Sequence, residues 1–117
     1  MFEKFDEINR LLDFYGGLLS NIQLECMNLY YRFDYTLSEI AEEYSISRQA
    51  VSENIKRAEQ KLYGYEEALN LADRFYKREE ALDNAIKRLD KLINSIEDKK
   101  LCCEISDIVE VLRPLSS

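Results

Sequence analysis

Glycine and proline are so scarce in this chain that few folds are open to it. Three glycines and one proline among 117 residues leave almost no turn-forming positions. Sandwiches and barrels join many short strands through tight turns, so the scarcity excludes both. Hydrophobic residues still make up 46% of the sequence, which is enough for a core in one domain, with or without an added element. Every long segment of the chain has helical periodicity, which predicts an all-α fold.

Helical periodicity runs through the first part of the chain. Apolar residues recur every three to four positions up to Tyr15, and the pair of glycines that follows predicts the end of a first helix. Two pairs, Ser20 with Gln23 and Thr36 with Glu39, have the spacing of a capping box, in which each partner satisfies a free amide of the other. They predict helices that begin after Ser20 and Thr36 and extend over about 21–32 and 37–44.

The next two helices have the outline of a helix-turn-helix. A three-residue connection, Ser45-Ile46-Ser47, leads into a helix over about 48–63, for which Ser47 is the expected N-cap. That helix is amphipathic, with an apolar face made of Val51, Ile55, Ala58 and Leu62 and a polar face made of Arg48, Gln49, Ser52, Glu53, Lys56 and Gln60. We expect the helix-turn-helix domain to occupy residues 1–64, with Gly64 at its junction to the remainder.

Residues 65–117 follow a different pattern. Between Tyr65 and Ile96 the apolar residues step alternately by three and four positions, with Glu79 at the one missing step, which is the spacing of a heptad seam. A long helix over 66–98 would measure about 50 Å at 1.5 Å per residue. A break at 98–100 and a short helix over 104–112, ended by Pro114, complete the predicted C-terminal extension.

This extension either folds back on the N-terminal helices or pairs with a second copy of the chain, and we expect it to do both. Helix-turn-helix proteins commonly act as dimers on paired half-sites, although a dimerisation element suits an adaptor equally well. The predicted interface of an isologous homodimer comprises Leu82, Ile86, Leu89, Ile93, Ile96, Ile105, Ile108 and Leu112.

Several kinds of chemistry are excluded by residue types. The chain has no histidine, which removes the commonest general base, the Ser-His and Cys-His pairs and every His-containing zinc site. Cys26, Cys102 and Cys103 lack the spaced pairs of a disulfide framework or a Cys-only zinc site. No glycine-rich loop is present to hold nucleotide phosphates. We therefore expect no enzymatic activity, no cofactor and no metal.

The sequence also indicates where the protein is found. Charges occur every few residues at the N-terminus, with no apolar segment of the kind found in signal peptides. No apolar run approaches the roughly 20 residues needed to span a bilayer. Both features predict a soluble, cytoplasmic protein.

Two stretches with a fixed separation carry a family resemblance. Leu37-Ser38-Glu39-Ile40-Ala41 and Ser47-Arg48-Gln49-Ala50-Val51 resemble region 4 of bacterial sigma factors, the helix-turn-helix domain that reads the −35 promoter element. The turn position that is often glycine in such domains is Ser45 here, and serine adopts that conformation at some cost. The chain has no room for the promoter-melting segment of a sigma factor, so the resemblance is to the domain alone.

A second resemblance covers nearly the whole chain. Leu11-Leu12-Asp13-Phe14-Tyr15-Gly16, Ser47-Arg48-Gln49-Ala50-Val51 and Asn54-Ile55-Lys56-Arg57 are similar to the YlxM family of small bacterial proteins. In that family a sigma-like helix-turn-helix precedes an extra helical segment. The resemblance implies a context in the signal recognition particle pathway, with the particle's RNA or its GTPase as a partner.

The sigma-like domain implies which residues would contact nucleic acid. By analogy, Arg48, Gln49, Ser52 and Glu53 would reach base edges in the major groove, and Lys56 and Arg57 would contact the backbone. Arg32 would touch a flanking phosphate. The leading interpretation is therefore a regulatory or accessory protein that binds DNA or the particle's RNA.

The overall charge argues in the other direction. The chain has a net charge of −7, whereas most nucleic-acid-binding proteins are basic. Residues 47–62 carry four Lys or Arg against two Glu, a local excess of only +2. The alternative interpretation is an adaptor that does not bind DNA, docks on the protein component of the signal recognition particle and modulates it, with the polar helix face as ordinary solvated surface.

Overall fold

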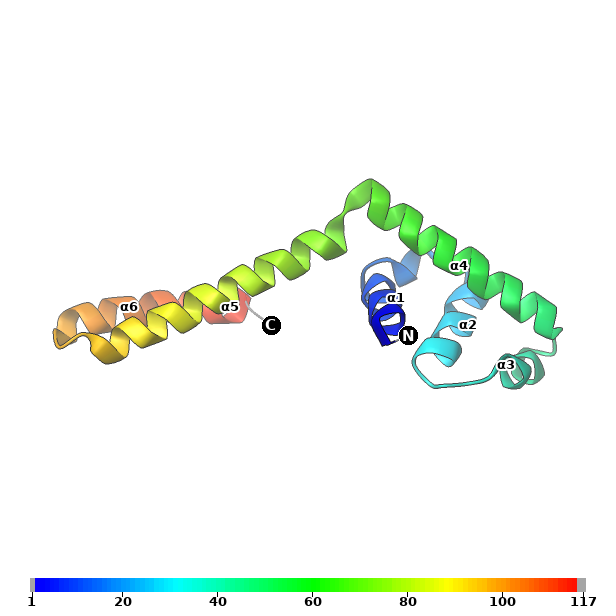
Figure 1. The fold of residues 1–117 in the computed structure, drawn as a ribbon, viewed down its shortest axis with the longest axis horizontal. Coiled ribbons are helices and arrows are strands. Elements are labelled where there is room, and N and C mark those ends of the chain that lie inside the picture. Colours follow the sequence, from blue (N-terminus) through cyan, green and yellow to red (C-terminus); the bar gives the residue numbers. More distant parts are fainter. Residues whose placement is uncertain (1, 116–117) are drawn as a thin grey trace. The chain divides into compact units, whose positions relative to one another are not determined.

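A computed structural model of the chain describes residues 2–115. Within that range the elements are α1 (Phe2–Tyr15), the 3₁₀ segment η1 (Gly16–Leu18), α2 (Asn21–Tyr31), α3 (Leu37–Tyr44), α4 (Arg48–Leu69), α5 (Leu71–Ser95), α6 (Lys99–Leu112) and the 3₁₀ segment η2 (Arg113–Leu115). The predicted all-α fold, a helix-turn-helix followed by a long helix and a short last helix, is confirmed (Figure 1).

The chain divides into two compact units, residues 1–72 and residues 73–117. In the first unit α4 lies across α1, α2 and α3 and packs against all three (Figure 1). The residues that α4 buries are those of its predicted apolar face: Val51, Ile55, Ala58 and Leu62. The other helices contribute Ile8, Leu11, Leu12, Tyr15, Cys26, Met27, Tyr31, Ile40 and Ala41 to the same core. Burying each large aliphatic side chain contributes about 1.5–3 kcal/mol, so this core accounts for most of the unit's cohesion.

The predicted helix starts are present. Ser20 and Gln23 form a capping box at the start of α2, and Thr36 and Glu39 form one at the start of α3. Ser47 caps α4 by accepting a hydrogen bond from the Ala50 amide at 3.0 Å. Each cap satisfies amides that have no partner inside the helix and contributes about 1 kcal/mol.

The predicted end of the fourth helix is wrong. We expected it to stop near Tyr63, with a junction at Gly64, but α4 continues through Gly64 to Leu69. It ends where Asn70 adopts a left-handed conformation, with φ of 55°, and donates its N–H to the carbonyl of Glu66. Asparagine is one of the few side chains that tolerates this conformation, which makes it a helix stop of the kind usually provided by glycine. The first compact unit accordingly extends past Gly64.

Side chains of the first unit bond to the first amides of α5. Tyr15 donates a hydrogen bond to Glu66 Oε1 at 2.6 Å and accepts one from the amide of Leu71 at 3.1 Å. Glu66 Oε1 also accepts from the amide of Ala72 at 3.1 Å. The first amides of a helix lack acceptors of their own, so Tyr15 and Glu66 together cap α5.

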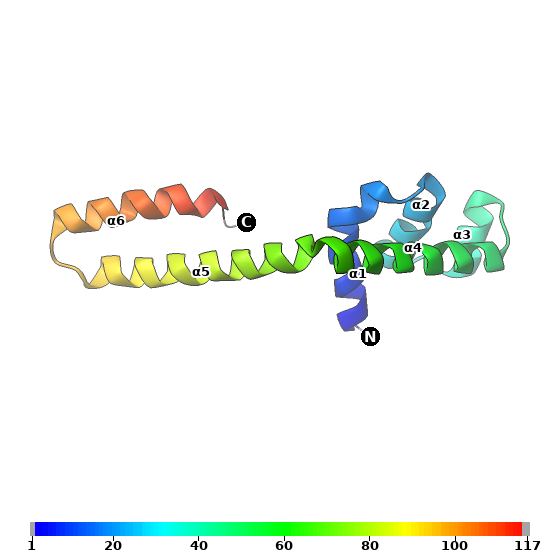
Figure 2. The same cartoon turned by 90° about the horizontal axis from the view of Figure 1, so that it is seen from above.

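In the second unit α5 and α6 form an antiparallel hairpin (Figure 2). Its register is fixed near the loop by Cys102 Sγ, which donates to the carbonyls of Ile93 at 3.4 Å and Ile96 at 3.2 Å. Near its open end Arg113 Nη2 donates to both carboxylate oxygens of Asp90, at 3.1 and 3.0 Å. These bonds place the seam of α5 against α6 within one chain.

Two further predicted boundaries are wrong for local reasons. The single helix over 66–98 is divided at Asn70 and ends at Ser95. The last helix begins at Lys99 rather than at Glu104, because the Asp98 carboxylate accepts from the amides of Lys100 and Leu101 and so caps it.

No helix among residues 2–115 combines the length and the apolar character needed to cross a membrane.

The continuity of α4 is testable at Gly64. A Cβ built at this position meets no atom within 4 Å, and Gly64 lies in the helix interior. Gly64→Ala should therefore raise the free energy of unfolding by about 1 kcal/mol, measured by chemical denaturation. Ala68→Gly, an exposed position in the same helix, should lower it by a similar amount. A flexible junction at Gly64 would instead make Gly64→Ala neutral or destabilising.

Candidate nucleic-acid interface

The turn before α4 sets how that helix is presented. Ser45 adopts the left-handed conformation, with φ of 54° and ψ of 45°, at the position where glycine is frequent in this motif. The turn is closed by the amide of Ile46, which donates to the carbonyl of Ala41 at 3.0 Å. A left-handed serine costs about 1–2 kcal/mol relative to glycine, and the packing of α3 and α4 on either side maintains it. On the outer side of the start of α4, Arg48, Gln49 and Ser52 are exposed.

The structure brings together six of the seven predicted contact residues. We call this set the front face of α4, and it consists of Arg48, Gln49, Ser52, Glu53, Lys56 and Arg57. All six are exposed, on the part of the helix that the core residues do not occupy. Their role in binding stays a prediction, but their placement side by side on an open helix surface is what that role requires.

Arg32, the seventh predicted residue, lies elsewhere and is engaged. It follows the end of α2, where its Nη2 donates to Asp13 Oδ1 at 2.7 Å and its Nε donates to Asn9 Oδ1 at 3.4 Å. These bonds join α2 to α1 at an exposed site. A phosphate would have to compete with Asp13 for this guanidinium, so Arg32 is a weaker candidate than the residues of the front face.

The charged side chains of the front face are held less firmly than that of Arg32. Arg57 lies 3.8 Å from Glu53, one helical turn away, and both side chains are largely exposed. Such pairs contribute only about 0.3–0.5 kcal/mol, so either side chain can turn toward a ligand. Among residues 2–115, the side chains of Arg48 and Lys56 take part in no hydrogen bond or ion pair. The front face carries three positive charges against one negative charge, a net charge of +2.

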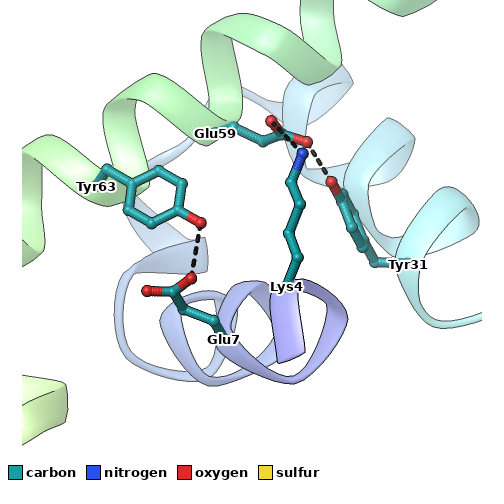
Figure 3. Close-up of polar contacts among 5 residues, drawn as sticks. All are labelled: Lys4, Glu7, Tyr31, Glu59 and Tyr63. Carbon is teal, nitrogen blue, oxygen red and sulfur yellow. Dashed lines mark hydrogen bonds and ion pairs between the residues drawn. The ribbon is translucent and has the colours of Figure 1, made fainter. Parts of the chain in front are cut away.

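The C-terminal half of α4 is joined to α1 and α2 by tyrosine–glutamate pairs that the sequence did not reveal. Tyr31 donates a short hydrogen bond to Glu59, which also lies 3.6 Å from Lys4, and Tyr63 donates to Glu7 at 3.0 Å (Figure 3). Glu59 thereby contacts side chains of both α1 and α2. The partners are 28 and 56 residues apart, so no local sequence pattern could have paired them.

These pairs alter tyrosine acidity. Burial, then the hydrogen bond to Glu7, raises the pKa of Tyr63 to about 12. Burial and the hydrogen bond to Glu25 likewise raise the pKa of Tyr44 to about 12. For Tyr31, burial and then the bond to Glu59 raise the pKa well above the ordinary value. In each case ionisation would place a phenolate against a carboxylate.

Most of the protein's negative charge lies in the same unit as the front face. Residues 1–72 contain seven Lys and Arg against 13 Asp and Glu, a net charge of −6, whereas residues 73–117 contain nine against ten, a net charge of −1. Part of this charge is close to the motif, since Glu39, Glu42 and Glu43 are exposed on α3. The front face is a small basic area on an acidic unit.

The predicted dimer residues are distributed differently. Ile86 is buried in the α5–α6 hairpin, and Leu82, Leu89, Ile93, Ile96, Ile105 and Leu112 are half-buried. Ile108 is 54% exposed.

Of the thiols, Cys26 is buried in the first unit, Cys102 is half-buried in the hairpin and Cys103 is exposed. Residues 2–115 hold no group of three Cys, Asp or Glu side chains suited to a metal ion.

A short helix, a three-residue turn and a longer helix with an open polar face define a helix-turn-helix protein. Comparison with known proteins agrees: the family model described as "Putative helix-turn-helix protein, YlxM / p13 like" matches residues 2–103. The chain therefore belongs to this family, UPF0122, which is described by its motif and not by an enzymatic activity.

Curated relatives match along most of their length. The chain is 42% identical to the protein YlxM of Bacillus subtilis over 113 residues, which cover 97% of this chain and 96% of that protein. It is 47% identical to a relative from Halalkalibacterium halodurans over 97 residues, which cover 83% of this chain and 89% of the relative. The expected family membership is thus confirmed.

The tyrosine–glutamate pairs predict a loss of stability at high pH. Because the folded pKa values of Tyr44 and Tyr63 exceed the ordinary value near 10, the pairs contribute fully below pH 10. Their contribution is lost as the pH rises from about 10 to 12. The denaturation midpoint of the wild-type protein should fall over that interval, and the midpoint of the Tyr63→Phe variant should fall less.

Absorbance titration at the tyrosinate band provides the check. In the native protein part of the change should occur near pH 12, and Tyr63→Phe should reduce that part, while the denatured chain titrates near pH 10. Native and denatured curves that superimpose would contradict the pairs.

Proposed function

We propose that this protein is a cytoplasmic nucleic-acid-binding regulator that inserts the N-terminal half of α4 into a major groove. The observation that carries the proposal is the front face: six exposed polar side chains on the helix that follows a helix-turn-helix turn. An α-helix fits the major groove of B-form DNA, and residues in its first turns reach base edges. The fold therefore offers a reading helix without rearrangement.

The side chains of the front face suit different contacts. Arg48 and Gln49 have the donor geometry for guanine and adenine edges, respectively, and Glu53 can accept from the amino group of cytosine. Ser52 lies between them and can bond to either kind of edge. Lys56 and Arg57 lie further along the helix and would meet the phosphate backbone. Regular A-form RNA has a major groove too narrow for this helix, so an RNA ligand would be contacted at loops, bulges or phosphates.

The charge distribution sets the expected strength of binding. A net charge of −6 on residues 1–72 opposes approach to phosphates, and at physiological ionic strength salt screens charges more than about 8 Å apart. At shorter distances the net charge of +2 on the front face attracts phosphates. Affinity should be modest and steeply dependent on salt.

The same charge favours a second candidate, an adaptor that does not bind nucleic acid. The acidic surface of α3 would repel a DNA backbone but suits a basic protein surface. The family resemblance suggests the signal recognition particle pathway as the context, with the particle's RNA as ligand in the first candidate and its GTPase as the docking partner in the second.

Replacement of front-face residues separates the two candidates. In fluorescence-anisotropy titrations with genomic DNA fragments and with the particle's RNA, Lys56→Ala should weaken binding by several-fold and lower the salt slope by about one. Arg48→Ala, at a base-edge position, should reduce affinity about tenfold or more. Lys87→Ala, an exposed lysine of the second unit, is the matched control and should have no effect.

Titrations at roughly 50 and 200 mM salt provide the second criterion, since a few phosphate contacts predict a loss of about tenfold or more over that range. Absence of binding to either nucleic acid at the lower salt would rule out the first candidate. Equal losses of affinity for Lys56→Ala and Lys87→Ala would show that the binding surface does not lie on α4.

A further inference from the structure

Lys61 is a cation of α4 whose only bonded partner is neutral. Its side chain is exposed, and its Nζ donates a hydrogen bond to Gln23 Oε1 at 3.0 Å. Within residues 2–115 this is the one hydrogen bond of the Lys61 side chain, which takes part in no ion pair. Because the acceptor is an uncharged amide, the positive charge of Lys61 is not neutralised and can still attract an anion.

Gln23 holds that ammonium in place. The Gln23 side chain is only 7% exposed, and it completes the capping box of α2 with Ser20. Its Oε1 accepts from the amide of Ser20 at 3.3 Å as well as from Lys61. A buried side chain that is bonded to its own helix start has little freedom, so Lys61 is anchored to a fixed point. A group that is already ordered loses less entropy when a ligand binds to it.

The position of Lys61 is electrostatically unfavourable for the protein on its own. A positive charge beside the first turn of a helix, here α2, opposes the dipole of that helix. Arg57, four residues earlier, is a like charge, and such pairs destabilise a helix. The other residues at helical spacing from Lys61 are not acidic: Ala58, Gly64 and Tyr65. Local rules of this kind are typically broken at functional sites, where the function requires the residue.

Lys61 also continues the front face along one flank of α4. On a regular helix it lies about 6 Å along the axis from Arg57 and about 40° around it. Glu59, whose carboxylate bonds to Tyr31, lies about 200° around the helix from Lys61. Arg57 and Lys61 therefore form a pair of positive charges, which we call the basic flank, and Glu59 does not lie on it.

We propose that Lys61 binds a phosphate of the DNA backbone at the place where α4 leaves the major groove. The groove is about 8.5 Å deep, whereas Lys61 lies about 20 Å along the helix from Arg48. When the first turns of α4 read base edges, the basic flank is thus beyond the bases and meets the phosphates that border the groove. The ammonium has three donors and Gln23 engages one, so two remain for phosphate oxygens. This inference rests on the proposed function.

Neutralising Lys61 in two different ways tests the proposal, in fluorescence-anisotropy titrations of the full chain with a DNA duplex. Lys61→Gln removes the charge. Gln23→Glu keeps Lys61 but places a carboxylate beside its ammonium, and glutamate at this position still completes a capping box. Each variant should weaken binding several-fold and should lower the slope of log K against log salt concentration by about one.

Lys4→Gln is the matched control, because it changes the net charge of the same unit by the same amount. Lys4 already lies 3.6 Å from the carboxylate of Glu59, so this variant should leave the affinity and the salt slope unchanged.

Chemical denaturation separates binding from folding. Lys61→Gln keeps an N–H donor and removes the repulsion from Arg57, and Gln23→Glu adds an acid at the start of α2, where it is favourable. Neither variant should lower the denaturation midpoint. If Lys61→Gln does lower it, Gln23→Glu, which retains the lysine, decides the test.

The outcomes distinguish this inference from the proposed function. Wild-type protein that does not bind the duplex would overturn both. Binding that Lys56→Ala weakens, but that Gln23→Glu leaves unchanged, would overturn the role of Lys61 alone. Equal losses for Lys4→Gln would also overturn it, because the effect would then be one of net charge.

Discussion

The burial of one apolar stripe on α4 supports the rest of the first unit. Val51, Ile55, Ala58 and Leu62 are each at most 7% exposed, and they are the surface against which α1, α2 and α3 pack. Because this stripe is covered, the remaining circumference of the helix is what the unit presents to solvent. The front face is therefore a consequence of core packing, and a helix that rotated to expose its basic residues differently would lose its contacts with all three neighbours.

Polar side chains add specific hydrogen bonds to the packing of the apolar stripe. Tyr31 and Tyr63 donate hydrogen bonds to Glu59 and Glu7 where α4 meets α2 and α1, so that these two carboxylates have partners within the unit. Tyr15 and Glu66 perform a comparable role at the start of α5. Hydrogen bonds to carboxylates are stronger than those between neutral groups, and they are effective where water is partly excluded. The result is a small basic area on a unit whose net charge is −6.

Local sequence signals predicted the fold well, whereas contacts between residues far apart in the sequence could not be predicted. The motif could be derived from sequence because its signals depend on residues that are close together: the capping boxes at Ser20 and Thr36 and the apolar period of α4. Asn70 was a local signal too, but the heptad pattern that runs past it obscured the end of α4 there. The break at 98–100 was expected, although the cap that Asp98 provides for α6 was not. The tyrosine–glutamate pairs join residues far apart in the sequence. Whether the seam of α5 meets α6 or another chain depends on tertiary packing, which periodicity alone does not encode.

Amide chemical shifts of the full chain, followed as a mixed-sequence DNA duplex is added at low salt, test most directly whether α4 is the nucleic-acid-binding surface. The account predicts progressive, saturable shifts concentrated at residues 45–57, with smaller changes where α3 adjoins the turn. Residues of α6 should be unaffected. Shifts that cluster outside residues 45–57, or spectra that do not change at millimolar duplex, would contradict it.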